Sequence, residues 1–208
     1  MRRWIGPGAL LVDVEGHGRE DLFDDVDLSR TVGWFTSQYP VLLDSEGGAL
    51  QDDVRAMASS LKATPHKGIG WGLLRRLGSE GVARELQLLP EASVSFNYLG
   101  RLDRALPGSS DIVRATEPIG PLRHPLANRP YLLDVLAQIE DGCLRVQWIF
   151  SEAIHARSTI EAAASEFAVQ LGQLAELAGS AEPEVGDFPL ARGLGEDALS
   201  AILAQVKG

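Results

Sequence analysis

Apolar and polar positions along the chain follow the two-residue period of strands in several short stretches. Residues 93–99 alternate, with Val94, Phe96 and Tyr98 on one predicted face and polar side chains on the other. Residues 10–14 are mainly apolar, which predicts a strand buried on both faces. Residues 131–139 and 144–150 flank an Asp-Gly turn, which predicts a β-hairpin. Residues 31–36, rich in β-formers, predict one more strand that continues into residues 40–43.

Other stretches follow the period of an amphipathic helix. Four apolar residues recur at spacings of four, three and four before Pro65, and these are Leu50, Val54, Met57 and Leu61. A short helical run, residues 73–77, ends at Gly78. A longer helix begins at a Ser158 or Thr159 cap. Its apolar stripe is Ile160, Ala163, Ala164, Phe167, Leu171, Leu174 and Leu177. The pattern therefore predicts an α/β chain.

Composition changes twice along the chain. Residues 101–130 are rich in proline and glycine and show little periodicity, which indicates a long irregular excursion. From residue 178 to 186, Gly, Ser, Pro and Glu dominate, which is typical of a linker, and a short helix is predicted over 197–206. We therefore expect one domain over residues 1–180 and a linker with a terminal helix over residues 181–208.

Charge and cysteine content narrow the function classes. The net charge of −10 argues against nucleic acid as a partner, because phosphate binding requires a basic face. Cys143 is the single cysteine, which excludes an internal disulfide, fits a reducing compartment and is expected to be a small buried apolar residue. The apolar run at residues 9–12 is too short for a signal peptide, and no stretch is long enough to span a membrane. We expect a cytoplasmic protein.

The richest candidate chemistry lies at residues 12–20, where an apolar run leads into ionisable residues separated by glycines. Glu15 at the end of a strand is the best candidate for a general base, because desolvation would raise its pKa toward neutrality. Arg19 could hold that charge or bind an anion, and His17 could act as acid or base or bond a carbonyl group. An exposed polar turn explains the same pattern without catalysis.

Other familiar sites are not indicated. The four histidines lack metal-ligand spacing, and the acidic residues 21–27 are expected to form a solvated surface loop rather than a metal site. Glycine-rich residues 67–72 lack the Gly-Lys-Ser/Thr ending of a phosphate loop, and no Gly-x-Ser-x-Gly elbow occurs. The large aromatic side chains are expected in the core rather than at a substrate platform. They are Trp34, Phe35, Trp71, Phe96 and Trp148.

Four stretches together resemble the epimerization domains of non-ribosomal peptide synthetases, within the condensation-domain superfamily. Residues 15–20 (Glu-Gly-His-Gly-Arg-Glu) look like one family motif, and residues 30–36 with Tyr39-Pro40 look like the next. Residues 65–72 are similar to a third motif, with Trp71 where the family usually has Tyr, and residues 96–101 resemble a fourth. Each motif is modest alone, but the ordered set is specific and covers residues 1 to about 180. Residues 187–190 look like the linker that follows such domains.

The resemblance implies a fold and indicates that this chain carries only part of an active site. Such domains consist of two chloramphenicol-acetyltransferase-like lobes, each with a mixed β-sheet flanked by helices, and their active site lies in the tunnel between the lobes. This chain looks like the C-terminal lobe only, because the first lobe carries a His-His-x-x-x-Asp-Gly motif and no His-His pair occurs here. We therefore expect an excised fragment, a truncated product or half of a split protein, inactive alone.

The resemblance also implies the chemistry, which is inversion of the Cα of an aminoacyl or peptidyl thioester on a carrier protein. Glu15, Arg19 and Tyr98 match catalytic or supporting positions, and His17, Asn97 and Trp34 are candidates for substrate binding. Strand alternation puts Asn97 and Tyr98 on opposite faces, so at most one can point into the tunnel. No metal and no cofactor are expected on this chain; the substrate would be carried on the phosphopantetheine of the carrier protein.

Several alternatives stay open. A condensation-type lobe that forms amide bonds shares the fold, a non-catalytic module could dock a carrier protein, and a stable α/β domain could use the motifs only to hold strand ends together. The expected partners are the peptidyl carrier protein, the missing N-terminal lobe and neighbouring synthetase domains. Apolar surface that the first lobe would cover also predicts some self-association.

Overall fold

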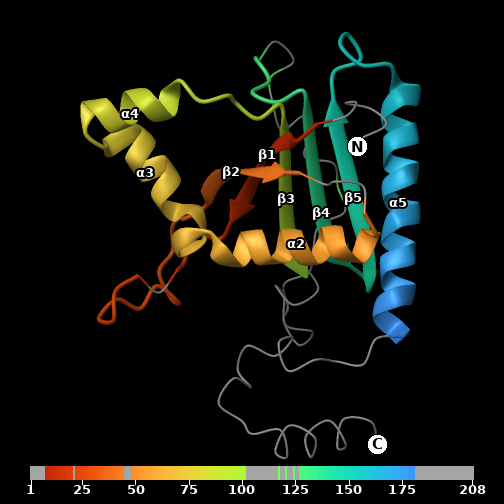
Figure 1. Ribbon diagram of the computed structural model, residues 1–208, viewed down its shortest axis with the longest axis horizontal. Coiled ribbons are helices and arrows are strands. Elements are labelled where there is room, and N and C mark those ends of the chain that lie inside the picture. The colour runs from red at the N-terminus through yellow and green to blue at the C-terminus, as the bar shows by residue number, and fades with distance from the viewer. Residues whose placement is uncertain are drawn as a thin grey trace, which may run out of the picture. The chain divides into compact units, whose positions relative to one another are not determined.

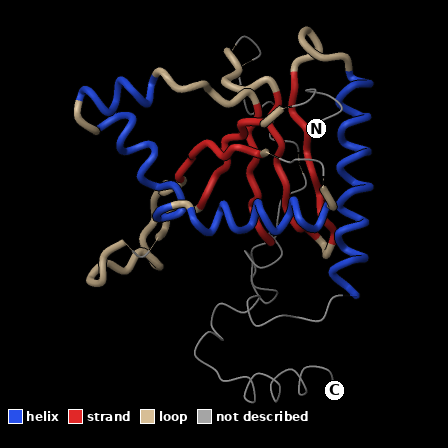
Figure 2. Tube along the Cα trace, viewed as in Figure 1, coloured by secondary structure: helices blue, strands red, loops and turns tan. Residues whose placement is uncertain are grey.

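The computed structural model describes residues 8–20, 22–44, 48–101, 117, 120, 124 and 127–180. Five strands form one mixed sheet in the order β2-β1-β3-β4-β5 (Figure 1). They are β1 (Leu10–Gly16), β2 (Ser37–Leu43), β3 (Val94–Arg101), β4 (Leu133–Glu140) and β5 (Cys143–Phe150). The central pairs β1–β3 and β3–β4 are parallel, and β2 and β5 pair antiparallel at the edges. The expected mixed sheet with flanking helices is thus confirmed (Figure 2).

One face of the sheet forms the apolar core. In-register side chains Val12, Val94 and Leu133 come from adjacent parallel strands and are at most 4% exposed. Ile160, on the first turns of α5 (Arg157–Ser180), belongs to the same cluster. Trp148 of β5 meets Phe167 edge to face, with ring centroids 5.8 Å apart. The predicted helical stripe is therefore correct near its start, whereas Leu171 and Leu177 are more than a third exposed.

The opposite face of the same strands is polar. Because side chains alternate, the residues between the core positions point the other way. Asp13 of β1, Ser95 of β3 and Asp134 of β4 stand in one row across the three parallel strands. Ser95 and Asp134 are less than a tenth exposed, so this row is polar and yet largely shielded from water. β1 is therefore not the two-face apolar strand that its composition predicted.

The helices between β2 and β3 follow the predicted pattern only in part. The amphipathic helix is confirmed as α2 (Leu50–Ala63), which is drawn on the viewer's side of the sheet in Figure 1 and has no buried residue. A 3-10 turn, η1 (Pro65–Gly68), leads directly into α3 (Ile69–Leu77), so the helix starts earlier than residue 73. The following α4 (Glu80–Gln87) is one that the apolar pattern did not indicate.

Residues 31–36 do not form the predicted strand. β2 begins at Ser37, which pairs with the last residue of β1, Gly16. Residues 31–36 therefore lie beyond the end of the ladder, where β1 offers no partner, and strand propensity without a partner does not make a strand. Val32 and Trp34 are accordingly 100% and 92% exposed, so the expectation that Trp34 packs in the core is wrong.

The β4–β5 hairpin is confirmed. Asp141 and Gly142 both have positive φ, 52° and 71°, as a two-residue turn between twisted strands requires. Cys143 follows the turn and is exposed, contrary to the expected burial, because it lies at the open end of an edge strand.

Some expectations concern residues outside the described part. They are most of the excursion over residues 101–130, the linker and the terminal helix over 197–206. By contacts, the chain divides into residues 1–167 and 168–208. Within the described residues, no helix has the length and apolar character needed to cross a membrane, and no cluster of His, Cys, Asp and Glu could hold a metal ion.

Candidate functional site

The polar face of the sheet brings Glu15 and Asn97 together. The parallel register aligns Val14 with Phe96, so the next residue of each strand falls on the polar face, side by side. The Asn97 side-chain amide donates a hydrogen bond of 2.5 Å from Nδ2 to Glu15 Oε2. Two motifs that lie 82 residues apart in sequence thus meet at one end of β1 and β3. This contact orients the carboxylate.

Further polar contacts continue along this face from the Glu15–Asn97 pair. The Tyr131 hydroxyl donates to Asp13 Oδ2 at 2.6 Å. Ser95 Oγ donates to Asp134 Oδ1 at 2.8 Å. Arg129 donates to the other oxygen of Asp134 at 2.7 Å and to the backbone carbonyl of Ile149 at 2.8 Å. These contacts hold the strand starts in register beneath the candidate base.

Sequence reasoning overlooked these residues, although a signal existed. Asp13, Ser95 and Asp134 each occupy the polar-facing parity of a predicted strand, and a polar residue amid an apolar strand needs a partner. Arg129 precedes β4 and carried no pattern of its own, and Tyr131 was predicted only as the first residue of that strand.

The phenol of Tyr131 is strongly perturbed. Burial raises its pKa well above the ordinary value, and the hydrogen bond to Asp13 raises it further, followed by the negative charges of Asp13, Asp134 and Glu15. The hydroxyl is therefore a fixed donor at neutral pH.

The loop after β1 is held by its backbone and by ion pairs. Gly18 has a φ of +65°, and a Cβ there would overlap the carbonyl group of Phe35, so glycine is required. His17 Nδ1 accepts a hydrogen bond of 2.9 Å from the backbone N–H of Arg19, while its Nε2 lies 3.5 Å from Glu20 Oε1. The other oxygen of Glu20 lies 2.7 Å from Lys67 Nζ. The side chain of His17 is 64% exposed.

Arg19 binds the following loop. Its guanidinium donates to the carbonyl oxygens of Leu28 at 2.7 Å and Gly33 at 3.4 Å. It also lies over the ring of Phe35, 4.3 Å from the centroid. These contacts fix residues 28–35 against the end of β1. The geometry therefore gives Arg19 a positioning role in the described structure.

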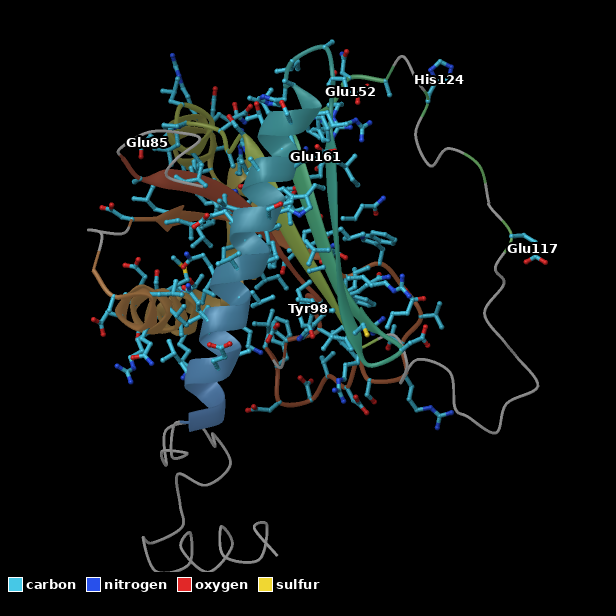
Figure 3. The ribbon with its side chains drawn as sticks, turned by 90° about the vertical axis from the view of Figure 1, so that its right-hand side faces the viewer. Glu85, Tyr98, Glu117, His124, Glu152 and Glu161 are labelled. Carbon is cyan, nitrogen blue, oxygen red and sulfur yellow. The ribbon has the colours of Figure 1, made fainter. Side chains whose placement is uncertain are left out.

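Tyr98 and Trp34 lie apart from the Glu15–Asn97 pair. Tyr98 aligns with Ala137 on the core-facing parity, beside an irregularity in the β3–β4 ladder, and is 49% exposed. Figure 3 places Tyr98 toward the end of the sheet that lies opposite Glu152. Trp34 is 92% exposed on its loop. Of the six candidate residues, the structure thus joins Glu15 to Asn97 and His17 to Arg19.

A cleft of about 660 Å³ opens between the sheet and α3. Its lining includes Asp13, Gln38 and Tyr131 from the sheet side and Trp71, Arg75 and Arg76 from α3. Gln38 is the cross-strand partner of Glu15, so the cleft extends to the position beside the candidate base, while Glu15 itself is not part of the lining. A cleft of this size can hold an extended small molecule.

The described residues form an α/β fold with a polar sheet face and an adjoining cleft. Residues 1–185 match the family model "Condensation domain", and the chain belongs to that family. It is 45% identical over 173 residues to a linear gramicidin synthase of Brevibacillus parabrevis, a match that covers 82% of this chain and 2% of that protein. It is 33% identical over 177 residues to a surfactin synthase of Bacillus subtilis (strain 168), covering 85% of this chain and 5% of that protein.

Solved structures show the same fold. The epimerization domain from the third module of tyrocidine synthetase B superposes with a TM-score of 0.75 at 34% identity, covering 84% of this chain and 39% of that chain. A chain of the non-ribosomal peptide synthetase FmoA3 shares the fold with a TM-score of 0.54 at 21% identity over 83% of this chain and 18% of its own length. The expected relationship to the condensation-domain superfamily, with an epimerization domain as a structural neighbour, is confirmed. The chain spans only a small part of each relative's length.

Proposed function

We propose that this chain is the C-terminal lobe of an epimerization domain that inverts the Cα of an aminoacyl or peptidyl thioester on a carrier protein. The hydrogen bond between Asn97 and Glu15 is the observation that carries the proposal. It holds a carboxylate in a fixed orientation at the end of β1, beside a cleft. The likeness to the tyrocidine synthetase epimerization domain supports the same assignment.

The chemistry follows from the acidity of the thioester. Glu15 removes the Cα proton, the electron pair of the broken C–H bond enters the enolate, and the proton resides on the carboxyl group. A second acid returns a proton to the opposite face of Cα, and the bond that forms there gives the inverted centre. Under microscopic reversibility Glu15 performs the return step for the other enantiomer. General acid–base catalysis of this kind contributes roughly 10²–10⁴-fold.

The second acid would come from the lobe that carries the His-His-x-x-x-Asp-Gly motif, since no His-His pair occurs in this sequence. The chain would then be inactive alone, with the carrier's phosphopantetheine arm delivering the substrate. Its partners would be that lobe, the peptidyl carrier protein and neighbouring synthetase domains. Self-association through surface that the first lobe covers remains a prediction.

A complementation assay tests the proposal. This chain is mixed with, or fused to, a first lobe and a carrier loaded with an L-aminoacyl thioester, and Cα deuterium exchange and the D/L ratio are followed. We expect exchange and inversion that require both lobes and that fall at least 100-fold in Glu15→Gln. Glu85→Gln, an exposed carboxylate on α4, is the matched control and retains activity. Full activity of Glu15→Gln in the fused protein would refute the proposal.

The match to the condensation-domain model favours a second candidate, an amide-forming lobe. The same fused protein, given an acceptor aminoacyl carrier, distinguishes the two. A dipeptidyl product without Cα exchange identifies the condensation activity, and exchange without a new amide bond identifies the epimerase.

A further inference from the structure

Asp13 presents a carboxylate to the cleft beside the sheet. It lies on the polar face of β1 and lines the 660 Å³ space together with Tyr131 and Gln38. Tyr131 donates to Oδ2 of Asp13 and thereby fixes the orientation of this carboxylate. An oriented carboxylate at the wall of a cleft is a strong hydrogen-bond acceptor for a ligand.

The carboxylate retains capacity for another bond. An ionised carboxylate has two oxygens and about four acceptor sites. Among the described residues, the hydroxyl of Tyr131 is the only group that hydrogen-bonds Asp13, and it takes Oδ2. Oδ1 is therefore available to a donor that enters the cleft.

The charges around Asp13 restrict what that donor can be. Arg75, on the opposite wall, is already paired at 2.7 Å with Glu91, which lines the same cleft. Arg76 adds one further positive charge to that wall. Asp134, two strands away, is bound by Ser95 and Arg129. Asp13 is thus the carboxylate on the sheet side of the cleft that can accept a hydrogen bond from a ligand. A small ligand with an N–H group fits this acceptor.

The spacing between Asp13 and Glu15 matches one substrate nitrogen next to Cα. Same-face residues of a strand lie about 6.6 Å apart. A base contacts its carbon at roughly 3–3.5 Å, and an N–H···O bond adds about 2.9 Å. The substrate's C–N bond, about 1.5 Å long, joins these two contacts. The path from Glu15 through Cα and the nitrogen to Asp13 can therefore span the separation of the two carboxylates.

We propose that Asp13, oriented by Tyr131, accepts a hydrogen bond from the α-nitrogen of the acyl group whose Cα faces Glu15. This inference rests on the proposed function and assigns a residue of the site to recognition of the substrate's α-nitrogen. Acyl groups that carry an N–H on the α-carbon, either as an amine or as an amide, are bound in preference to acyl groups without nitrogen. Asp13 is then a specificity determinant, and Tyr131 is a positioning residue.

Binding to the ¹⁵N-labelled chain tests this directly and needs no turnover. The probes are the pantetheine thioesters of leucine, N-acetylleucine and 4-methylpentanoic acid, the last being leucine without its nitrogen. Each is titrated while amide chemical shifts of the cleft are followed. All three share the pantetheine amides, so those groups cannot produce a difference. We expect both nitrogen-bearing probes to bind about tenfold more tightly, as one charge-assisted hydrogen bond predicts.

Three variants separate recognition from packing. Asp13→Ala abolishes the preference. Asp13→Asn keeps the shape of the side chain and a hydrogen-bond acceptor but removes the charge, so the preference should fall to roughly threefold. This variant keeps the test decisive if Asp13→Ala does not fold. Tyr131→Phe keeps the carboxylate but removes the hydrogen bond that orients it, so the preference weakens without disappearing.

Equal affinity for all three probes, absence of saturable binding, or a preference that survives Asp13→Ala would overturn the proposal. The inversion assay depends on Glu15 and on the second lobe, whereas this titration depends on neither. A failed inversion assay with an intact nitrogen preference therefore refutes the proposed function alone, and the reverse result refutes only the role of Asp13.

Discussion

Asn97 on β3 donates its side-chain amide to Glu15 on β1, across two parallel strands whose registers are fixed by an apolar face on the other side of the sheet. The contact therefore depends on the parallel pairing of β1 with β3 and on the apolar packing of the opposite face. The core pairs Val12 with Val94, and this register places the two polar side chains at the same level three residues later. The candidate base is thus positioned by the packing of the opposite face.

Replacing Asn97 with Asp puts a second carboxylate against Glu15. At pH 7 the unfolding free energy should drop by about 1–3 kcal/mol, because a donor is lost and like charges meet. The repulsion raises the pKa of the paired carboxyls in the folded state above that in the unfolded state, so the folded form binds more protons. The loss should therefore shrink as the pH falls from 7 toward 4.

Urea denaturation at several pH values measures this effect. Asn128→Asp, at an exposed site, is the matched control and should show little change at any pH. A loss in Asn97→Asp that is the same at pH 4 and pH 7 would mean that the two side chains do not interact.

Arg19→Lys removes the planar fork that binds two carbonyl groups and stacks on Phe35. We expect residues 22–36 to exchange their amide hydrogens faster and the protein to lose about 1–2 kcal/mol, while β3 and β4 keep their protection. Hydrogen exchange followed by mass spectrometry resolves these segments. Arg30→Lys on the same loop is exposed and serves as control. Unchanged exchange in Arg19→Lys would exclude the positioning role.

Strands could be predicted from the sequence where the local pattern also indicates how the strand pairs or which face is buried. The alternation of residues 93–99 and the Asp-Gly hairpin gave β3, β4 and β5 nearly in full, and alternation correctly separated Asn97 from Tyr98. Residues 31–36 show the limit of this reasoning. Their β-formers lie beyond the end of β1, and local propensity does not contain the information that no partner strand is there.

The site was predictable only in part, for a similar reason. Glu15 and Asn97 could be named from their motifs, but their contact depends on a parallel register between distant strands. The bond from Tyr131 to Asp13 spans 118 residues and follows no local rule. Arg19 was expected to hold the charge of Glu15 or to bind an anion, whereas its guanidinium lies over the ring of Phe35 and donates to the carbonyl oxygens of the following loop.

Tyr131 should titrate at unusually high pH. Its pKa is raised from 10.0 by burial, by the bond to Asp13 and by nearby carboxylates, so the folded state retains this proton longer than the unfolded chain. The stability from this group is complete below pH 10 and is lost as the pH rises toward the folded-state pKa. Absorbance of the phenolate measures the titration, and denaturation in urea measures the stability.

Tyr131→Phe should remove the most alkaline component of that titration and flatten the alkaline fall in stability. Burial and the charge of Glu20 also raise the pKa of Tyr39, so that residue must be assigned separately. Tyr98→Phe, half exposed, controls for the loss of one phenol. Survival of the most alkaline component in Tyr131→Phe would contradict the assignment.

The turn that joins η1 to α3 offers a test of strain with a control two residues away. Gly68 has a φ of +79°, and a Cβ there would overlap the ring of Tyr39, so Gly68→Ala combines backbone strain with a clash. We expect a loss of roughly 2 kcal/mol or more in unfolding free energy, since α3 cannot shift without moving the wall of the cleft.

Gly70 lies inside α3, with nothing within 4 Å of an added Cβ. Gly70→Ala should therefore stabilise the protein by up to about 1 kcal/mol through helix propensity. Thermal and urea unfolding of the two variants side by side measure the difference, and equal stabilities would show that the left-handed turn before α3 does not form.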